Sequence, residues 1–246
     1  MNIIEQFIIP NKYTRPQIQL TSVQKIVIHW ISQTSSAQNN IIYCSTMPTN
    51  PNPRYCGFQS VIDKDGTIYK TMPFGEKTYG CGTADYNNYT KLGKQLYDDF
   101  GSPNNVTFNI ELCHPDMTGK PTVETYKGIV EYVAYLCNVF TLDPFNDVVL
   151  HSDIVSTSVK PPCHKWFYSN PSKWNSFKNE VSTLMSSNDY QNSWEQQNGE
   201  EAIDSLVQHG IINTPEMWKS KNLRDTPAPL WLFFVELDRV MNEVKK

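Results

Sequence analysis

Three side chains that favour zinc stand where strands of this sequence are expected to end. His29 closes the apolar run 25–30, and His151 directly follows a second apolar run, 148–150. Cys163 comes later along the chain, directly after two prolines. Two imidazoles and a thiolate suit zinc, and three protein ligands leave the fourth tetrahedral position open for water, as in catalytic zinc sites. The sequence therefore predicts a catalytic zinc centre held by these three residues.

Two further residues could move a proton or stabilise charge beside such a metal. Glu111 stands near the end of another expected strand, so its carboxylate can reach the same edge, take a proton from water and return it to a leaving amine. Lys160 shortly precedes Cys163, and its ammonium could stabilise an oxyanion. Spacing alone also allows simpler interpretations, namely a surface glutamate on an edge strand and a solvated loop lysine.

Other polar and aromatic residues fall near these positions. His114 and His164 are alternative ligands, although we expect both to lie on the surface or behind the ligands. Four aromatic residues could pack on a sugar or a peptide, but aromatic side chains more often serve packing alone. These residues are Trp30, Tyr55, Tyr79 and Tyr86.

The pattern of apolar residues predicts the elements that position these side chains. Short apolar runs predict strands, and the Asp-Gly step at 65–66 predicts a hairpin. The expected strands are 25–30, 58–62, 67–72, 105–113 and 147–150. Apolar residues spaced by three and four predict helices over 35–47, 122–140 and 170–185. We expect an α/β fold, with a central mixed β-sheet flanked by helices and the site at one rim.

The remaining segments predict how the chain is organised. Residues 1–22 are polar and contain prolines, so we expect an irregular extended arm, and 75–101 predicts a long loop with one short helix. After a catalytic domain over 1–185, the Ser-, Asn- and Gln-rich segment 186–199 predicts a linker. Residues 200–246 predict a small C-terminal α-helical module, near the lower size limit for independent folding.

Composition excludes several classes of protein. A net charge of −4 provides no broad basic field for nucleic acid, and no apolar run is long enough for membrane insertion. The first residues lack the basic and apolar regions of a signal peptide, so we expect a cytoplasmic protein. The six cysteines include no CxxC pair. Cys44, Cys56 and Cys81 remain open as buried thiols or as partners in one bridge formed after export.

Taken together, these segments resemble the zinc-dependent N-acetylmuramoyl-L-alanine amidases of the type 2 amidase family, particularly phage endolysins of Gram-positive hosts. The similarity covers roughly residues 5–180 and rests on several motifs in combination. These motifs are the strand ending in His29, the hairpin 61–69, the Ile110-Glu111 step, the segment 111–120, the His151-Ser152-Asp153 triplet and Lys160 before Cys163.

The resemblance implies a Zn²⁺ cofactor held by His29, His151 and Cys163, with Glu111 and Lys160 as catalytic residues. It implies a peptidoglycan hydrolase that cleaves the amide between N-acetylmuramic acid and L-alanine and so lyses bacteria. It also implies that the C-terminal module binds the Gram-positive cell wall and that a holin releases the enzyme from the host cytoplasm. Family members often carry Tyr or His where this chain has 57–60, so we expect Glu111 to carry more of the proton transfer.

Two alternatives come from other functional classes. The same fold serves as a non-catalytic peptidoglycan-binding protein, but receptors that do not cleave typically lack the thiolate ligand, so Cys163 favours an enzyme. A structural zinc or redox protein is the second alternative, and it requires more than one thiolate on the metal.

Overall fold

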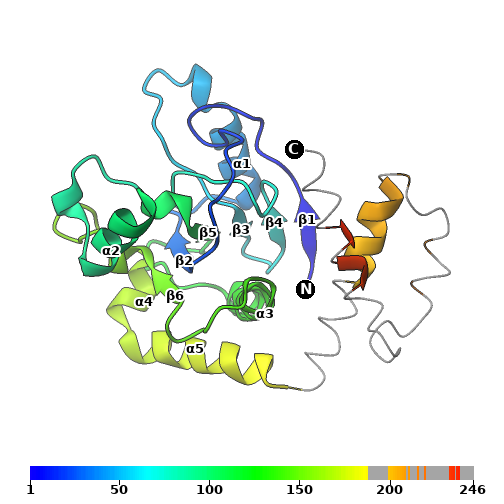
Figure 1. Cartoon of the computed structure of the whole chain (residues 1–246). Coiled ribbons are helices and arrows are strands. Elements are labelled where there is room, and N and C mark those ends of the chain that lie inside the picture. The colour runs from blue at the N-terminus through cyan, green and yellow to red at the C-terminus, as the bar shows by residue number, and fades with distance from the viewer. Residues whose placement is uncertain are drawn as a thin grey trace. The chain divides into compact units, whose positions relative to one another are not determined.

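The computed structural model of this chain describes residues 1–187, 199–208, 210, 215, 219, 233–235, 237 and 238 (Figure 1). The chain divides into two compact units, Met1–Ser182 and Thr183–Lys246. Most of the expected linker, residues 188–198, lies outside the described residues, as does much of the expected helical module. None of the helices in the described ranges is both long and apolar enough to cross a membrane.

A mixed six-stranded sheet forms the centre of the first unit, in the order β1-β4-β3-β5-β2-β6. Its strands are β1 (Ile3–Glu5), β2 (Lys25–Trp30), β3 (Ser60–Ile62), β4 (Ile68–Lys70), β5 (Thr107–Leu112) and β6 (Val148–Leu150). The hairpin pair β3–β4 is antiparallel, and the other neighbouring pairs are parallel. The predicted α/β class and mixed sheet are therefore confirmed.

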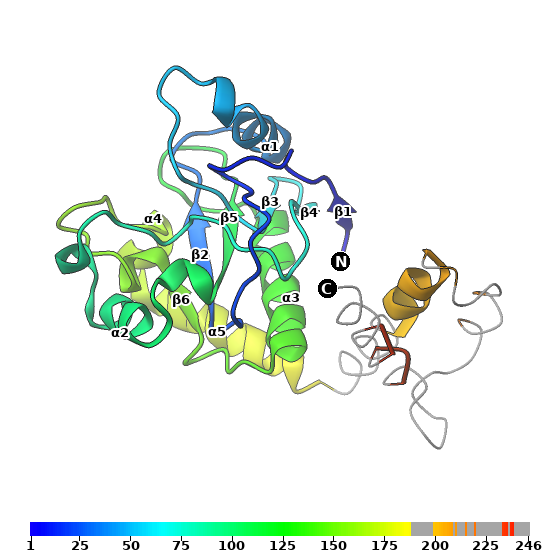
Figure 2. The same ribbon diagram turned by 45° about the horizontal axis from the view of Figure 1, so that its top comes forward.

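The strands that carry the candidate site lie next to one another within this sheet (Figure 2). Parallel strands are covered on both faces, and β2 shows the expected apolar run, whereas β5 alternates polar and apolar residues although five of its six residues are buried. His29 on β2 pairs with Glu111 on β5, and Ile28 pairs with Leu150 on β6. Parallel neighbours end at the same edge, so His29, Glu111 and the start of the turn after β6 come together there.

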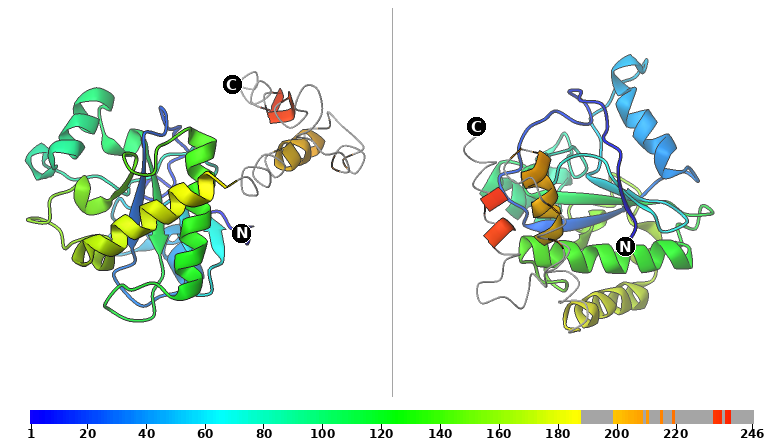
Figure 3. Two further views of the ribbon diagram at one scale, coloured as in Figure 1. Left: turned by 90° about the horizontal axis from the view of Figure 1, so that it is seen from below. Right: turned by 90° about the vertical axis from the view of Figure 1, so that its right-hand side faces the viewer.

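One face of the sheet is covered by α3 (Val123–Phe140), and α5 (Pro171–Met185) lies on the outer side of α3 (Figure 3). Thr122 caps α3 by accepting a hydrogen bond from the Thr125 amide. The Tyr132 hydroxyl on α3 is hydrogen-bonded to Ser60 Oγ at 2.6 Å, which ties the helix to β3. Both helices were predicted from their spacing of apolar residues, and both are confirmed.

The opposite face carries two separate hydrophobic clusters. The first packs α1 (Ala37–Ser45) against β3, and its fully buried members include Ala37, Val61, Met72 and Cys113. The second packs α2 (Lys91–Phe100) against β2, and its fully buried members include Val27, Cys81, Val106 and Ile154. Val61 is the register partner of Glu111, and Val27 is the register partner of Asn109. The polar residues of β2 and β5 therefore share this face with the two clusters.

The prediction of an irregular arm over 1–22 is wrong at its start. Ile3–Glu5 forms the edge strand β1, and Ile8 is fully buried. The strand is short and is extended by main-chain hydrogen bonds from Gln6 N to Lys70 O and from Ile8 N to Thr71 O. Such an edge strand needs no alternation of apolar residues, so its sequence does not distinguish it from an irregular segment. The short helix α4 (Lys165–Ser169) was also not predicted.

In the second unit, residues 199–208 are helical. Ala202, Ile203, Leu206 and Phe234 form a small buried cluster of their own. Lys219 Nζ lies 2.7 Å from an Asp204 carboxylate oxygen. The described part of this unit is therefore helical and has its own apolar contacts.

Candidate metal centre

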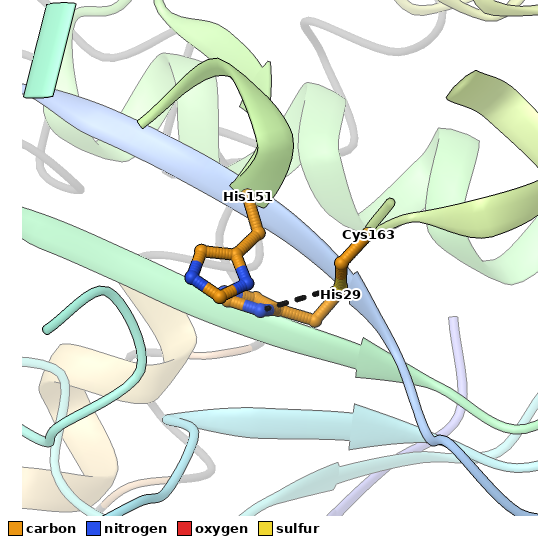
Figure 4. A group of neighbouring side chains, drawn as sticks. All are labelled: His29, His151 and Cys163. Carbon is orange, nitrogen blue, oxygen red and sulfur yellow. Dashed lines mark hydrogen bonds between the residues drawn. The ribbon is translucent and has the colours of Figure 1, made fainter. Parts of the chain in front are cut away.

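His29, His151 and Cys163 converge at the C-terminal ends of the parallel strands (Figure 4). One potential ligand atom from each lies within 4.8 Å of the other two. His29 Nδ1 is 3.8 Å from Cys163 Sγ, and the two imidazole centroids are 4.7 Å apart. The sequence prediction that these three residues meet agrees with this geometry, and their role as metal ligands stays a prediction.

The turn that follows β6 positions both His151 and Cys163. His151 begins the 3₁₀ turn His151–Asp153, and Asp153 Oδ2 accepts a hydrogen bond of 2.8 Å from Leu150 N. Ser152 N and Ser152 Oγ both donate to Cys163 O, at 2.7 and 2.6 Å. Cys163 N donates to Ser152 Oγ at 2.7 Å. Ser152 therefore holds the backbone of Cys163 beside His151, although the two residues are well separated in sequence.

Burial sets the protonation of all three side chains in the metal-free protein. It lowers the pKa of His29 to about 4, against the hydrogen bond with Asn109, and lowers the pKa of His151 well below its ordinary value, helped by the charge of His29. Burial, followed by the charge of Glu111, raises the pKa of the Cys163 thiol. Both imidazoles are neutral at pH 7, as metal ligands must be, whereas Cys163 would have to release its proton to bind a metal.

These donors fit zinc. Ligands of one tetrahedral zinc lie about 3.3–3.8 Å apart, given metal–ligand bonds of about 2.0–2.3 Å. The observed separations of up to 4.8 Å therefore require only small movements of side chains. His151 Nε2 is buried and has no hydrogen-bond partner among the described residues. His164 Nε2 and Asn138 Nδ2 are likewise unpartnered, so the fit to zinc rests on the types and spacing of the three donors.

Glu111 lies on a central strand, so its interpretation as a surface residue of an edge strand is wrong. Its side chain shares the face of its register partner His29. Glu111 Oε2 is buried and has no hydrogen-bond partner in the part of the chain that the structure describes. Burial first, and then the charge of Cys56, raise the pKa of Glu111 to about 8. The carboxyl group is therefore protonated at neutral pH in the metal-free protein and titrates near the pH at which a general acid–base works best.

Lys160 extends over the same region from an exposed position. Its Nζ donates to Gly82 O at 3.1 Å. Its charge contributes to the lowered pKa of His29 and of His151, and opposes the raised pKa of Cys163. The ammonium group therefore acts electrostatically on all three candidate ligands.

His114 and His164 are fully buried, which excludes the surface position and leaves the alternative of a position behind the candidate ligands. His114 Nδ1 lies 2.5 Å from Asp116 O, and its Nε2 lies against Ile31 O. His164 caps α4, and burial lowers its pKa to about 3. Neither joins the group of three ligands, and His114 instead links two loops through their carbonyl oxygens.

Sequence reasoning missed the polar residues behind His29. Asn109 Oδ1 lies 2.9 Å from His29 Nε2 and 3.0 Å from Cys81 Sγ. Gln59 hydrogen-bonds Asn109 in turn. The available signal was an asparagine within an apolar strand, two residues before Glu111 and hence on the same face. Cys81 lies near His29 Nε2, whereas Cys163 lies near Nδ1, so one sulfur belongs to the candidate ligand group.

The aromatic residues fall into separate sets. Tyr55 contacts Tyr79 and Tyr13, with ring centroids 5.0 and 5.3 Å apart, beside an open groove of about 460 Å³. Trp30 packs on His114, and Tyr86 contacts Tyr97. All six cysteines are free thiols, so none of the bridges left open by the sequence is formed.

Comparison with known proteins identifies relatives of this chain. N-acetylmuramoyl-L-alanine amidase BlyA of Bacillus subtilis is 28% identical over 199 residues, which cover 76% of this chain and 48% of that protein. N-acetylmuramoyl-L-alanine amidase CwlL of Bacillus licheniformis is 25% identical over 188 residues, which cover 75% of this chain and 48% of that protein. The chain thus spans about half the length of these relatives.

Solved structures show the same fold. The PlyG catalytic domain aligns with a TM-score of 0.56 at 18% identity, covering 76% of this chain and 98% of that domain. The catalytic domain of XlyA aligns with a TM-score of 0.51 at 22% identity, covering 74% of this chain and 99% of that domain. The sequence profile of the N-acetylmuramoyl-L-alanine amidase family matches residues 19–163, a range that contains His29, His151 and Cys163 as well as Glu111 and Lys160. This chain belongs to the N-acetylmuramoyl-L-alanine amidase family.

Proposed function

We propose that this chain hydrolyses the amide between N-acetylmuramic acid and L-alanine in peptidoglycan. The observation that carries the proposal is the convergence of His29, His151 and Cys163 within the segment matched by the amidase family. The unpartnered carboxyl oxygen of Glu111 on the same face supports it, because amide hydrolysis needs a group that can move a proton.

The chemistry follows from the side chains at this edge. His29, His151 and Cys163 hold zinc, which when bound polarises a carbonyl and lowers the pKa of water to about 7. The ionised form of Glu111, which the positive charge of a bound zinc would favour, would accept a proton from the attacking water and deliver it to the departing amine. A carboxyl group whose pKa is about 8 can exchange a proton in both directions near neutral pH. Lys160 places a positive charge where the amide oxygen becomes negative.

The products of digested cell wall test the proposal. Purified peptidoglycan is incubated with the full chain and zinc, and the fragments are identified by mass spectrometry. A free lactyl carboxyl group and a new amino group on L-alanine are expected. Cleaved glycosidic bonds or cleaved peptide cross-links would show a different hydrolase. Binding to the wall with no products, together with zinc near zero per chain, would indicate a recognition protein instead.

Replacement of Lys160 by methionine is expected to slow wall hydrolysis by about a hundredfold, the loss typical of one oxyanion-stabilising donor. Zinc affinity should not fall, because the substitution removes a positive charge that acts on the ligands. Lys173→Met on an exposed part of α5 is the matched control and should keep the full rate. Equal rates for the two variants would remove Lys160 from the mechanism.

We propose that residues 1–185 hold the activity and that residues 200–246 target the enzyme to the Gram-positive wall. Truncation after Ser186 keeps α5 whole and retains the first compact unit. The shortened protein is expected to unfold in one cooperative transition and to hydrolyse soluble wall fragments at the full rate. In sedimentation with intact walls it should bind more weakly than the full chain. A truncated protein that does not fold would show that the proposed division is wrong.

A further inference from the structure

The imidazole of His29 has a different partner at each ring nitrogen. Nδ1 faces Cys163 Sγ at 3.8 Å, and Nε2 faces Asn109 Oδ1 at 2.9 Å. A neutral imidazole carries one hydrogen, on one of these nitrogens, and the other nitrogen holds the lone pair that can bind a metal. The nitrogen that carries the hydrogen is decided by whether Asn109 presents its oxygen or its amino group to Nε2.

Backbone groups decide the orientation of the Asn109 amide. Thr107 O is a carbonyl and can only accept, so the Asn109 atom 3.2 Å from it is the Nδ2 donor. The hydrogen bonds of Gln59 require the same orientation of the Asn109 amide. Its Nε2 donates to Glu76 O at 3.1 Å, so its Oε1 is left to accept from Asn109 N at 2.7 Å and from Asn109 Nδ2 at 3.2 Å. The Asn109 oxygen therefore points at His29.

We infer that Asn109, held in place by Gln59, is a positioning residue that fixes His29 in the tautomer with hydrogen on Nε2. Nδ1 then turns its lone pair toward Cys163 and is the atom offered to the metal. The inference rests on the proposed zinc centre and adds to it the atom that binds and the residues that select it. A hydrogen bond to the distal nitrogen of a ligating histidine also fixes the ring orientation.

Close packing holds the Asn109 side chain in this one orientation. Asn109, Gln59, Thr107 and Cys81 have no exposed surface. A Cβ atom at Gly80 would lie 2.5 Å from Asn109 Oδ1, so the chain passes the amide at a distance that only glycine permits. The Cys81 thiol also donates to the same oxygen at 3.0 Å. Hydrogen bonds that are buried and fully satisfied in this way are strong and hold a single geometry.

The tautomer can be measured in the full wild-type chain, with one variant used only to assign the signals. Long-range ¹H–¹⁵N correlation spectra of histidine-labelled protein distinguish a protonated Nε2 from a protonated Nδ1, and His29→Gln identifies the signals of His29. We expect hydrogen on Nε2 both in metal-free and in zinc-loaded protein. Hydrogen on Nδ1 in the metal-free protein would overturn the inference.

Zinc affinity, measured by competition with a chromophoric chelator, tests the consequence for binding. Asn109→Ala is expected to weaken zinc binding about 10–100-fold, the range found when the partner of a ligating histidine is removed. Asn109→Asp should stay close to wild type, because a buried, protonated carboxyl group can still accept from His29 and donate to Thr107 O. Asn104→Ala is the matched control, since this buried amide accepts from Cys81 N and does not contact His29.

The outcomes distinguish failure of the role proposed for Asn109 from failure of the proposed zinc centre. Wild-type protein that binds no zinc would contradict the proposed metal centre. Zinc binding by wild type that is unchanged in Asn109→Ala would contradict the role of Asn109 alone. If Asn109→Ala does not fold, the His29 tautomer in wild type and the affinity of Asn109→Asp decide the question. Weak zinc binding by Asn104→Ala would also count against the inference, because the loss would then reflect general loosening of the segment.

Discussion

Cys163→Ser is expected to lose both zinc and wall hydrolysis. Serine keeps the size of the side chain but replaces a thiolate with a hydroxyl that stays protonated at neutral pH and binds zinc poorly. The loss of affinity should exceed the roughly 10–100-fold caused by replacing a neighbour of a ligand. The fold should survive, because Ser152 bonds the backbone of residue 163 and not its side chain. Zinc per chain after dialysis and the clearing of wall suspensions measure the two effects.

Cys81→Ser is the matched control for that substitution. Cys81 is a buried thiol that lies 3.9 Å from His29 Nε2, on the side of the ring away from Cys163. Serine at this position keeps a donor for Asn109 Oδ1, so zinc and activity should remain. If Cys163→Ser retained a full complement of zinc and full activity, the proposed ligand set would be wrong. If both serine variants lost zinc, a centre with two thiolates would be indicated instead.

Glu111→Gln is expected to bind zinc and cell wall but to turn over about 10²–10⁴-fold more slowly, the range for loss of a general acid–base. Glutamine has nearly the same shape but cannot accept and return a proton. The catalytic rate on soluble wall fragments should fall with little change in KM. A rate equal to wild type would remove Glu111 from the proton transfer. Zinc content measured on the same sample shows whether the effect is on chemistry or on the metal.

The same substitution should stabilise the metal-free protein at neutral pH. The pKa of Glu111 rises from 4.5 to about 8 on folding, because of burial first and then the charge of Cys56. Below pH 4.5 both folded and unfolded states are protonated, and the native state keeps its full stability. Between the two pKa values the unfolded state alone ionises, so the free energy of unfolding falls as pH rises, by up to about 1.4 kcal/mol per pH unit. Glutamine lacks this dependence.

Chemical denaturation in the presence of a chelator measures this difference. At pH 5, Glu111→Gln and wild type should have similar free energies of unfolding. At pH 7, the variant should be more stable by about 3 kcal/mol. The lowered pKa values of His29 and His151 are common to both proteins and cancel in the comparison. A difference that did not grow between pH 5 and pH 7 would show that the Glu111 carboxyl group is solvated in the folded protein.

The sequence by itself determined the central elements and the residues they bring together. Apolar runs define β2 and β6, and alternating apolar residues define β5. Parallel strands end on a common side of the sheet, so His29, Glu111 and His151 could be expected there. Periodicity defined α3 and α5 in the same way. These features depend on local patterns with periods of two and of 3.6 residues, which a single sequence displays directly.

Tertiary structure alone decided how the side chains at that edge are held. Ser152 binds the backbone of Cys163, Asn109 faces Nε2 of His29, and β1 joins the sheet through main-chain hydrogen bonds. His114 and His164, which the sequence allowed on the surface, are fully buried. The physical reason is that a hydrogen-bond partner or a degree of burial depends on segments that are distant along the chain. Such contacts produce no periodic pattern in the sequence from which they could be predicted.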